Sequence, residues 1–471
     1  MRRHWKLLSV VLVAAVVATA CNYAYVPFIA RVDGPVVMTA GELGIGNFNL
    51  DPDRGVAYRW DADAADWVQI PVQVDERVVV DFGATPGNNN TAGTTGTIYG
   101  SGTDIGVTVL TYADPNTWVG ADSDATLDSD DEIVFLSRDA GEQAPNGTAP
   151  PAGTVGGVGR EVELVDPDGG TPGYVYFFYG TAGVDPSAGE DHVTYDFVLD
   201  AGNYKDDYLR ADGPNPESST VVTDNYSMGF SDRWFTVDLS SNWGTGVDIL
   251  DGHKSQFAYS TCGRSNATFA NAHGAFIANI DGPVRGIRAY IGANSGPITQ
   301  RTEYFYEDRY EQVTDLRVHA IPSIMSFWDW NSSASGLVFS SSELASPVTI
   351  DGVQDTVSTS VASWESLEGP QADITIATEF ESSFATTTVQ LHADYITPPF
   401  TECWGDGSVY GGHGQSVSSS LPNTDPRTGG TATFQSRSVL SVWPEATDLA
   451  AWAPVWAAEA LQDLDRTVTN F

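Results

Sequence analysis

The side chains best suited to chemistry in this chain are concentrated in residues 281–319. Five of the 19 arginines lie in this segment, although the net charge of the chain is −40. Alternating polar and apolar residues predict three consecutive strands here. A guanidinium can bind a carboxylate through two parallel hydrogen bonds, and a tyrosine ring can stack on a sugar. The residues with these capacities are Arg288, Arg301 and Arg317 as candidate substrate-binding residues, and Tyr290, Tyr304 and His319 as candidate catalytic residues.

Two interpretations of the arginine-rich segment follow from the sequence. In the first, the polar face of the strands binds an anionic polymer such as a uronic-acid glycan. A cation would neutralise the uronate carboxylate, and Tyr290, Tyr304 or His319 would serve as base and acid for β-elimination. In the second, the arginines form ion pairs with acidic residues across the strands, as cross-strand charges usually do. The candidate partners are Glu303, Glu307, Asp308 and Asp315.

The elements that must position these residues are strands along most of the chain. The sequence contains 47 glycines and 25 prolines, and only the segment after residue 447 has a helical pattern. We therefore expect an all-β fold with two antiparallel β-sandwich domains, long loops and a short C-terminal helical segment. The expected boundaries are a signal peptide at 1–20, an N-terminal β-sandwich at 21–182, and a larger β-sandwich with the C-terminal helix at 183–471.

An acidic segment at residues 122–132 carries six carboxylates. Calcium binds clustered oxygen ligands, so this segment is a candidate calcium site, with calcium the one cofactor that the sequence suggests. The spacing differs from that of an EF-hand, and a solvated acidic turn is the alternative interpretation. The candidate metal ligands are Asp122, Asp124, Asp128 and Asp130.

The N-terminus has the pattern of an export signal. Three basic residues within the first six positions precede an apolar core at residues 7–17. Residues 18–20, Ala-Thr-Ala, form a cleavage site and also resemble a bacterial lipobox, because Cys21 follows directly. We expect lipidation at Cys21 and a membrane-anchored lipoprotein at the cell surface or in the periplasm, or else full secretion.

The two other cysteines, Cys262 and Cys403, form an even pair. Because exported proteins fold in an oxidising compartment, the sequence predicts a disulfide between them. The surface is expected to be strongly acidic, since 43 of the 62 acidic residues are aspartate and only three residues are lysine. Such a chain lacks the extended basic face that a nucleic-acid backbone requires, so nucleic acid is not an expected partner.

Two short stretches in the N-terminal part resemble a known group of proteins. Residues 70–75, Ile-Pro-Val-Gln-Val-Asp, and 130–135, Asp-Asp-Glu-Ile-Val-Phe, resemble the N-terminal β-sandwich of certain secreted bacterial proteins related to polysaccharide-degrading systems. Residues 282–285, Gly-Pro-Val-Arg, resemble the start of a strand in the large super-sandwich sheets of polysaccharide lyases and their uncharacterised relatives. The resemblance covers about half of the chain and includes no catalytic motif, so it implies fold and habitat only.

These observations predict a secreted, lipid-anchored bacterial protein that binds or degrades an extracellular, acidic polysaccharide. If the protein is an enzyme, we expect a carbohydrate-active one similar to polysaccharide lyases. The alternative is a non-enzymatic structural or adhesion protein of the cell surface. The expected partners are the polysaccharide and, through the lipid anchor, the membrane.

Overall fold

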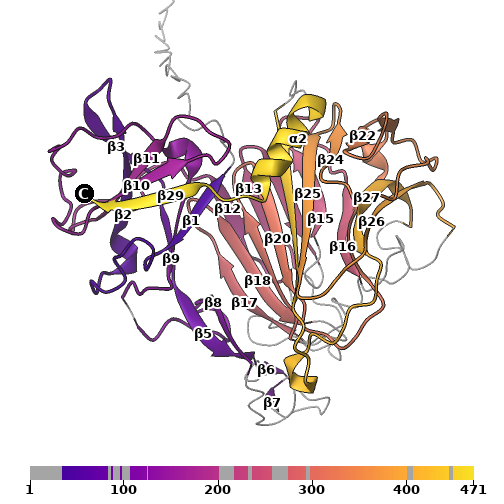
Figure 1. Cartoon of the computed structure of the whole chain (residues 1–471), viewed down its shortest axis with the longest axis horizontal. Coiled ribbons are helices and arrows are strands. Elements are labelled where there is room, and N and C mark those ends of the chain that lie inside the picture. The colour runs from indigo at the N-terminus through magenta and orange to yellow at the C-terminus, as the bar shows by residue number, and fades with distance from the viewer. Residues whose placement is uncertain are drawn as a thin grey trace, which may run out of the picture.

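A computed structural model of the chain consists almost entirely of antiparallel strands (Figure 1). It describes residues 34–82, 86–87, 96–97, 107–124, 126–200, 217–231, 236–256, 274–292, 298–399, 407–444 and 449–471. The prediction of an all-β fold with one short C-terminal helix is confirmed. Short 3-10 turns occur at η1 (Pro52–Arg54), η3 (Ser137–Asp139), η6 (Ser332–Ala334) and η7 (Pro426–Thr428).

The N-terminal part is a small sandwich of two sheets. One sheet has the order β1 (Pro35–Thr39), β9 (Glu132–Leu136), β4 (Gln73–Asp75). The other has the order β29 (Asp465–Asn470), β10 (Arg160–Val165), β11 (Gly173–Tyr179), β2 (Gly55–Asp61), β3 (Asp66–Ile70). Their facing apolar residues form one core, which includes Met38 and Phe135 from the first sheet and Val162 and Phe177 from the second.

The larger part is built on a nine-stranded sheet. Its order is β17 (Gly274–Ile280), β18 (Gly286–Gly292), β19 (Gln300–Phe305), β20 (Arg309–Asp315), β28 (Phe434–Trp443), β25 (Asp373–Ser382), β24 (Glu365–Glu368), β22 (Val338–Ser341), β23 (Val348–Thr349). One face of this sheet packs against two four-stranded sheets through a core that includes Tyr310, Leu440 and Trp330. We call this face the inner face and the opposite one the outer face.

The two four-stranded sheets complete the larger sandwich. The first has the order β12 (Val193–Asp196), β13 (Thr220–Thr223), β14 (Tyr226–Phe230), β15 (Thr236–Ser241). The second has the order β16 (Leu250–Gln256), β21 (Ile324–Trp330), β27 (Val409–Val417), β26 (Thr388–Tyr395). The backbone N–H of Ile249 donates to the carbonyl of Leu239, which joins the end of β15 to the start of β16.

The outer face of the nine-stranded sheet is covered at both ends. The hairpin of β5 (Arg77–Asp81) and β8 (Thr108–Tyr112) packs its apolar residues against β17 and β18. A second, two-residue pair joins β6 (Pro86–Gly87) to β7 (Gly96–Thr97). Helix α2 (Leu449–Ala460) covers β25 and β28, with Trp456 fully buried against Val439. Between hairpin and helix, the outer face meets the N-terminal sandwich.

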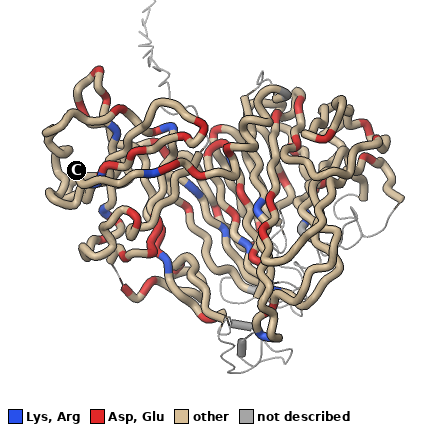
Figure 2. The backbone as a smooth tube through the Cα atoms, in the orientation of Figure 1, with Lys and Arg blue, Asp and Glu red and all other residues tan. Residues whose placement is uncertain are grey.

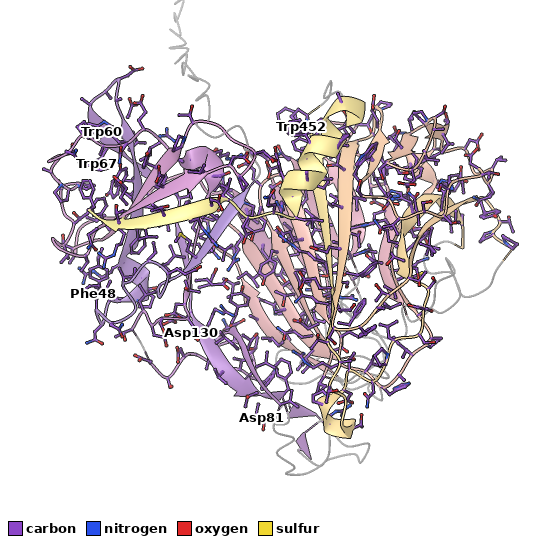
Figure 3. The ribbon with its side chains drawn as sticks, in the orientation of Figure 1. Phe48, Trp60, Trp67, Asp81, Asp130 and Trp452 are labelled. Atoms are coloured by element: carbon purple, nitrogen blue, oxygen red, sulfur yellow. The ribbon has the colours of Figure 1, made fainter. Side chains whose placement is uncertain are left out.

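The C-terminus returns to the N-terminal sandwich. Strand β29 pairs with β10 at the edge of the five-stranded sheet (Figure 1). The ring of Phe471 lies 5.5 Å from that of Trp67, which is labelled in Figure 3. The sequence pattern predicted the helix in this tail but not the strand. The only large apolar residue of β29 is Val468, so the segment lacks the alternation of apolar and polar residues that would indicate a strand. Pairing with the edge strand β10, rather than burial, therefore determines its structure.

The central strands differ from expectation in two respects. The third strand, β20, ends at Asp315, so Arg317 and His319 lie beyond it rather than within it. Moreover, every residue of β18 is buried, although the sequence predicted one polar, accessible face. The reason is that both faces of β18 are covered, by β12 and β14 on the inner side and by the β5–β8 hairpin on the outer side.

Candidate functional site

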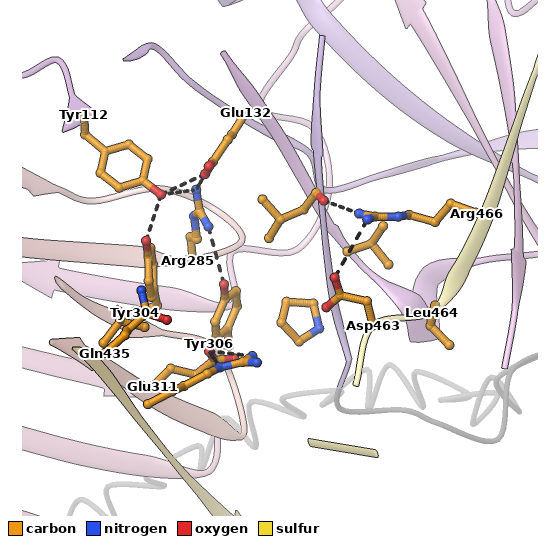
Figure 4. Close-up of a pocket in the computed structure, with 15 residues that line it drawn as sticks. Tyr112, Glu132, Arg285, Tyr304, Tyr306, Glu311, Gln435, Asp463, Leu464 and Arg466 are labelled. Carbon is orange, nitrogen blue, oxygen red and sulfur yellow. Dashed lines mark hydrogen bonds and ion pairs between the residues drawn. The ribbon is translucent and has the colours of Figure 1, made fainter. Parts of the chain in front are cut away.

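A cavity of about 300 Å³ lies between the outer face of the nine-stranded sheet and the N-terminal sandwich (Figure 4). Strands β19, β20 and β28 supply one wall, and β1, β9, the start of β29 and the two residues before it supply the other. It is lined by Pro35, Val36, Val37, Tyr112, Glu132, Arg285, Tyr304, Tyr306, Glu311, Val313, Gln435, Arg437, Asp463, Leu464 and Arg466. The volume is at the lower end of the range of about 300–1,000 Å³ that is typical of small-molecule sites.

Arg285 lies at the buried end of the cavity and bonds to several of its polar groups. Its Nη2 donates to Glu132 Oε2 at 2.6 Å and to Asp75 Oδ2 at 2.8 Å, and its Nε donates to Asp75 Oδ2 at 3.1 Å. The Tyr112 hydroxyl donates to Glu132 Oε2 at 2.8 Å and lies 3.0 Å from the Tyr304 hydroxyl. This network joins the N-terminal sandwich to the larger sheet, because Asp75 and Glu132 belong to the former and Arg285 and Tyr304 to the latter. Figure 4 shows Glu132, Arg285 and Tyr304 at the cavity.

A second charged group lies on the outer face of β20 and β28. Glu311 accepts from Arg309 Nη2 at 2.5 Å and from Arg437, whose Nη2 and Nε lie 3.0 and 3.1 Å from Oε2. Arg437 lines the cavity, and its side chain is 26% exposed. At the opposite wall, Arg466 donates to the carbonyl of Val37, and its Nη2 lies 3.8 Å from Asp463.

In the cavity, the pKa values of two carboxylates are lowered and those of two tyrosine hydroxyls are raised, so all of them lie further from neutral pH. Burial tends to raise the pKa of Glu132, but Arg285 and Arg77 outweigh it and hold that pKa below its usual range. Glu311 behaves in the same way, because Arg309 and Arg437 outweigh its burial. Burial raises the pKa of Tyr306 to about 12 and that of Tyr304 further. These carboxylates are therefore acceptors and these hydroxyls are donors, and none of the four is suited to exchange a proton near neutrality.

The candidate substrate-binding residue Arg288 lies on the inner face and is completely buried. Its Nη2 donates to Glu217 Oε1 at 2.6 Å, its Nη1 donates to Glu217 Oε2 at 3.0 Å, and its Nε lies 3.3 Å from Glu303 Oε2. Arg288 and Glu303 are directly opposite each other in the register of β18 and β19. For Arg288, the interpretation as a cross-strand ion pair matches the structure, and the interpretation as a groove donor does not.

Arg301 and Tyr290 are also on the inner face and buried. Arg301 Nη1 donates to the Tyr290 hydroxyl at 3.2 Å, and Nε donates to Thr314 Oγ1 at 3.1 Å. Burial raises the pKa of Tyr290 well above its usual value, against the opposing effect of Arg301. These groups form a polar layer inside the larger sandwich rather than a face open to a polymer.

The remaining candidates of the arginine-rich segment lie elsewhere. Arg317 is half-buried, donates to the carbonyl of Ile298 at 3.1 Å and lies over the ring of Phe82. His319 is exposed. Tyr304 is on the outer face, at the cavity, whereas Tyr290 is on the inner face. The structure therefore does not bring Tyr290, Tyr304 and His319 together as one catalytic group.

The acidic segment at 122–132 forms a turn of the N-terminal sandwich, with Asp130 labelled in Figure 3. Its carboxylates bind its own backbone: Asp122 accepts from the N–H of Asp124, and Asp128 accepts from the N–H of Asp130. Among the described residues, no three acidic, histidine or cysteine side chains are placed to hold a metal ion. The predicted ligands Asp122, Asp124, Asp128 and Asp130 are thus not gathered as metal ligands among the described residues, and calcium binding stays a prediction from the sequence.

Glu76, whose pKa is affected by carboxylates of this turn, gives the protein a pH-dependent stability. Burial, together with Asp131 and Asp122, raises the pKa of Glu76 from 4.5 to about 7. The folded protein then keeps a proton that the unfolded chain has already released, so this contribution to stability is lost as the pH rises from about 4.5 to about 7. Replacing Glu76 with Gln should therefore raise the melting temperature above about pH 7 and leave it unchanged below about pH 4.5. Equal effects at both pH values, measured by thermal unfolding, would contradict this account.

The three cysteines, Cys21, Cys262 and Cys403, lie outside the described residues, so lipidation and the disulfide remain predictions. In the described part of the chain, no helix combines the length and the apolar character needed to cross a membrane.

Several cavity residues were not predicted. Glu311, Arg437, Tyr112 and Arg466 come from four separate strands, and no local spacing connects them. The sequence contained one signal for this site. Tyr304 and Tyr306 alternate with Arg301 and Glu303, so the two tyrosines lie on one face of β19 and its continuation, and Arg301 and Glu303 lie on the other. Following the face of the two tyrosines across the sheet would have led to Glu311.

Comparisons with known proteins give little further information. No protein-family model matches the chain, and no curated protein matches it either. Among solved structures, the GalM/aldose epimerase homologue from C. elegans aligns over 53% of this chain and 99% of its own, with 7% identity and a TM-score of 0.27. A similarity of this size supports no statement about function. No comparison supports the resemblance to polysaccharide lyases suggested by the sequence.

Proposed function

We propose that this chain is an exported saccharide-binding protein and that one sugar unit of its ligand occupies the cavity between the N-terminal sandwich and the nine-stranded sheet. The observation that carries the proposal is the lining of this cavity, where tyrosines stand beside ionised pairs of carboxylate and guanidinium groups. Export and attachment through Cys21 belong to the same proposal, motivated by the N-terminal pattern. Intact-mass measurement of the membrane fraction would detect the lipid.

The cavity offers the interactions that sugar hydroxyls need. A hydroxyl both donates and accepts, so it is bound well where acceptors and donors alternate at short distances. Glu132 and Glu311 supply acceptors, and Arg437 supplies donors. Tyr304 adds aromatic surface that can pack against the C–H groups of a pyranose ring. The small volume favours a single sugar or the end of a chain.

The charges of the cavity favour a neutral saccharide over the acidic one that the sequence suggested. Its lining contains three arginines, Arg285, Arg437 and Arg466, and three acidic residues, Glu132, Glu311 and Asp463. The formal charges therefore cancel within the cavity, while the whole chain carries −40. A polyanion would be repelled at long range and would find no excess of positive charge at the site.

Binding is favoured over degradation for a separate reason. β-Elimination needs a base that accepts a proton from carbon, and hydrolysis of a glycosidic bond needs a carboxylic acid that keeps its proton near neutrality. In the cavity, burial keeps Tyr304 protonated, and the arginines keep Glu132 and Glu311 ionised. These states favour hydrogen bonding to a ligand and disfavour proton transfer.

A panel of immobilised neutral and uronic-acid oligosaccharides tests the proposal with the purified protein. We expect binding to neutral members, with an affinity that changes little with salt because no net charge is neutralised. Exclusive binding to acidic members, weakening as salt increases, would show that the ligand is recognised at a positively charged site and would overturn the proposal for this cavity.

A further inference from the structure

A buried lysine and a buried aspartate meet on neighbouring strands of the larger sandwich. Lys254 on β16 and Asp329 on β21 are both 0% exposed, and the Lys254 ammonium nitrogen contacts Asp329 Oδ2. In the register of the two strands, Gly252 is directly opposite Asp329 and Phe327 is directly opposite Lys254. Because Gly252 has no side chain, the lysine side chain can extend diagonally across the ladder to the carboxylate.

Apolar side chains lie on the same face of β21 as Asp329. Met325 and Phe327 alternate with the residues of the other face of β21, so they share a face with Asp329. Both belong to a buried cluster with Ala393 and Val409 from the neighbouring strands. An ion pair in such a place loses much of its hydration, whereas the neutral amine and the neutral acid do not.

The choice of lysine is unusual within this chain. Only three of its 22 basic residues are lysines. The other buried cations of the described residues are arginines: Arg160, Arg285, Arg288, Arg301 and Arg309. Arginine holds a carboxylate with a fixed geometry and stays charged, whereas a lysine amine can lose its proton and become a nucleophile. A purely electrostatic role would be served by the residue that the chain uses elsewhere.

We propose that Lys254 and Asp329 become joined by an intramolecular isopeptide bond. Proton transfer from the ammonium to the carboxylate gives a neutral amine and a neutral acid in contact. The amine nitrogen then attacks the carboxyl carbon, the C–N bond forms, and the C–O bond breaks. The departing oxygen leaves as water with two of the three ammonium protons, and the third stays on the amide nitrogen. The condensation needs no oxidant, no reductant and no further reactant.

The bond would link β16 covalently to β21. The two linked residues, Lys254 and Asp329, are 75 positions apart in the sequence. A covalent link of this kind restricts the unfolded chain in the same way as a disulfide, but reducing agents do not break it. It would suit a protein that works outside the cell, although it is independent of the saccharide proposal.

Mass spectrometry of the full mature chain tests the bond. After reduction, alkylation and digestion with chymotrypsin, we expect a branched peptide that contains both Lys254 and Asp329. Its mass should equal the sum of the two linear peptides less one water. In Lys254→Arg, which keeps the positive charge but cannot form the amide, the two peptides should separate and the melting temperature should fall.

Linear peptides at their unmodified masses in the wild-type digest would overturn the proposal and leave an ordinary buried ion pair. This reading depends on the wild-type protein alone, so it stands even if Lys254→Arg fails to fold. Saccharide binding by the same sample is measured separately, and its loss would not affect the result.

Discussion

Replacing Arg288 with Met should lower the free energy of unfolding by about 3–5 kcal/mol. The change removes the cation that both Glu217 and Glu303 contact, while the two carboxylates stay buried inside the larger sandwich. Burial already raises the pKa of Glu303, against the opposing effects of Arg288 and Arg301, so removal of Arg288 would raise it further. Urea unfolding of the wild-type and variant proteins measures the difference.

A matched change at a more accessible ion pair provides the control. Arg427 pairs with Asp425 at 2.5 Å, and its side chain is 20% exposed. Its partner Asp425 is buried but keeps the backbone N–H of Arg427 as a donor, so Arg427→Met should cost less than Arg288→Met. Combining Arg288→Met with Glu217→Gln should recover part of the lost stability, because one unpaired charge is removed. Equal effects of the two single changes would contradict the placement of Arg288 in the interior.

Replacing Arg437 with Met should weaken the binding of a neutral saccharide by about 1.5–3 kcal/mol, which corresponds to roughly a 10- to 150-fold loss of affinity. Arg437 lines the cavity with a side chain that is 26% exposed, and Met preserves most of its length. Stability should change less, since Glu311 keeps Arg309 as its partner at 2.5 Å. Calorimetric titration and thermal unfolding of the same variant separate the two effects.

For this change too, Arg427→Met is the control, because Arg427 forms an ion pair but does not line the cavity. It should leave affinity unchanged. An Arg437→Met variant that unfolds more easily and still binds with full affinity would mean that this arginine is structural and does not contact the ligand.

The fold class was predictable from the sequence because it depends on local patterns. Alternation and turn residues indicated strands at β18 and β19, and the helical spacing of Leu449, Trp452 and Trp456 indicated α2. The faces of the strands were less predictable. The sequence marks Arg288 and Arg301 as polar and therefore suggests an exposed face, but it does not show that Glu217, which is distant in sequence, provides a partner in the interior.

The candidate site was harder to predict because its parts come from distant segments. Asp75 and Glu132 lie in the two short N-terminal stretches, and Arg285 begins the segment that leads into β18. Only the folded chain brings them together. Figure 2 shows the related effect for charge: acidic positions are spread over both parts of the molecule, while several basic positions lie on the central strands (Figure 2). Basic residues are therefore concentrated in this segment of the sequence, as predicted. In the folded protein, buried carboxylates from other segments and from the same strands neutralise their charge.

The most direct test of the saccharide site is calorimetric titration of a variant whose cavity is filled. Val313 lines the cavity from β20, so Val313→Trp should occupy part of the volume of about 300 Å³. Val353, which is 65% exposed and does not line the cavity, provides the matched control Val353→Trp. With the neutral oligosaccharide that the wild-type protein binds best, we expect Val313→Trp to show no heat of binding and Val353→Trp to match the wild type. Undiminished binding by a correctly folded Val313→Trp variant would contradict the assignment of the site.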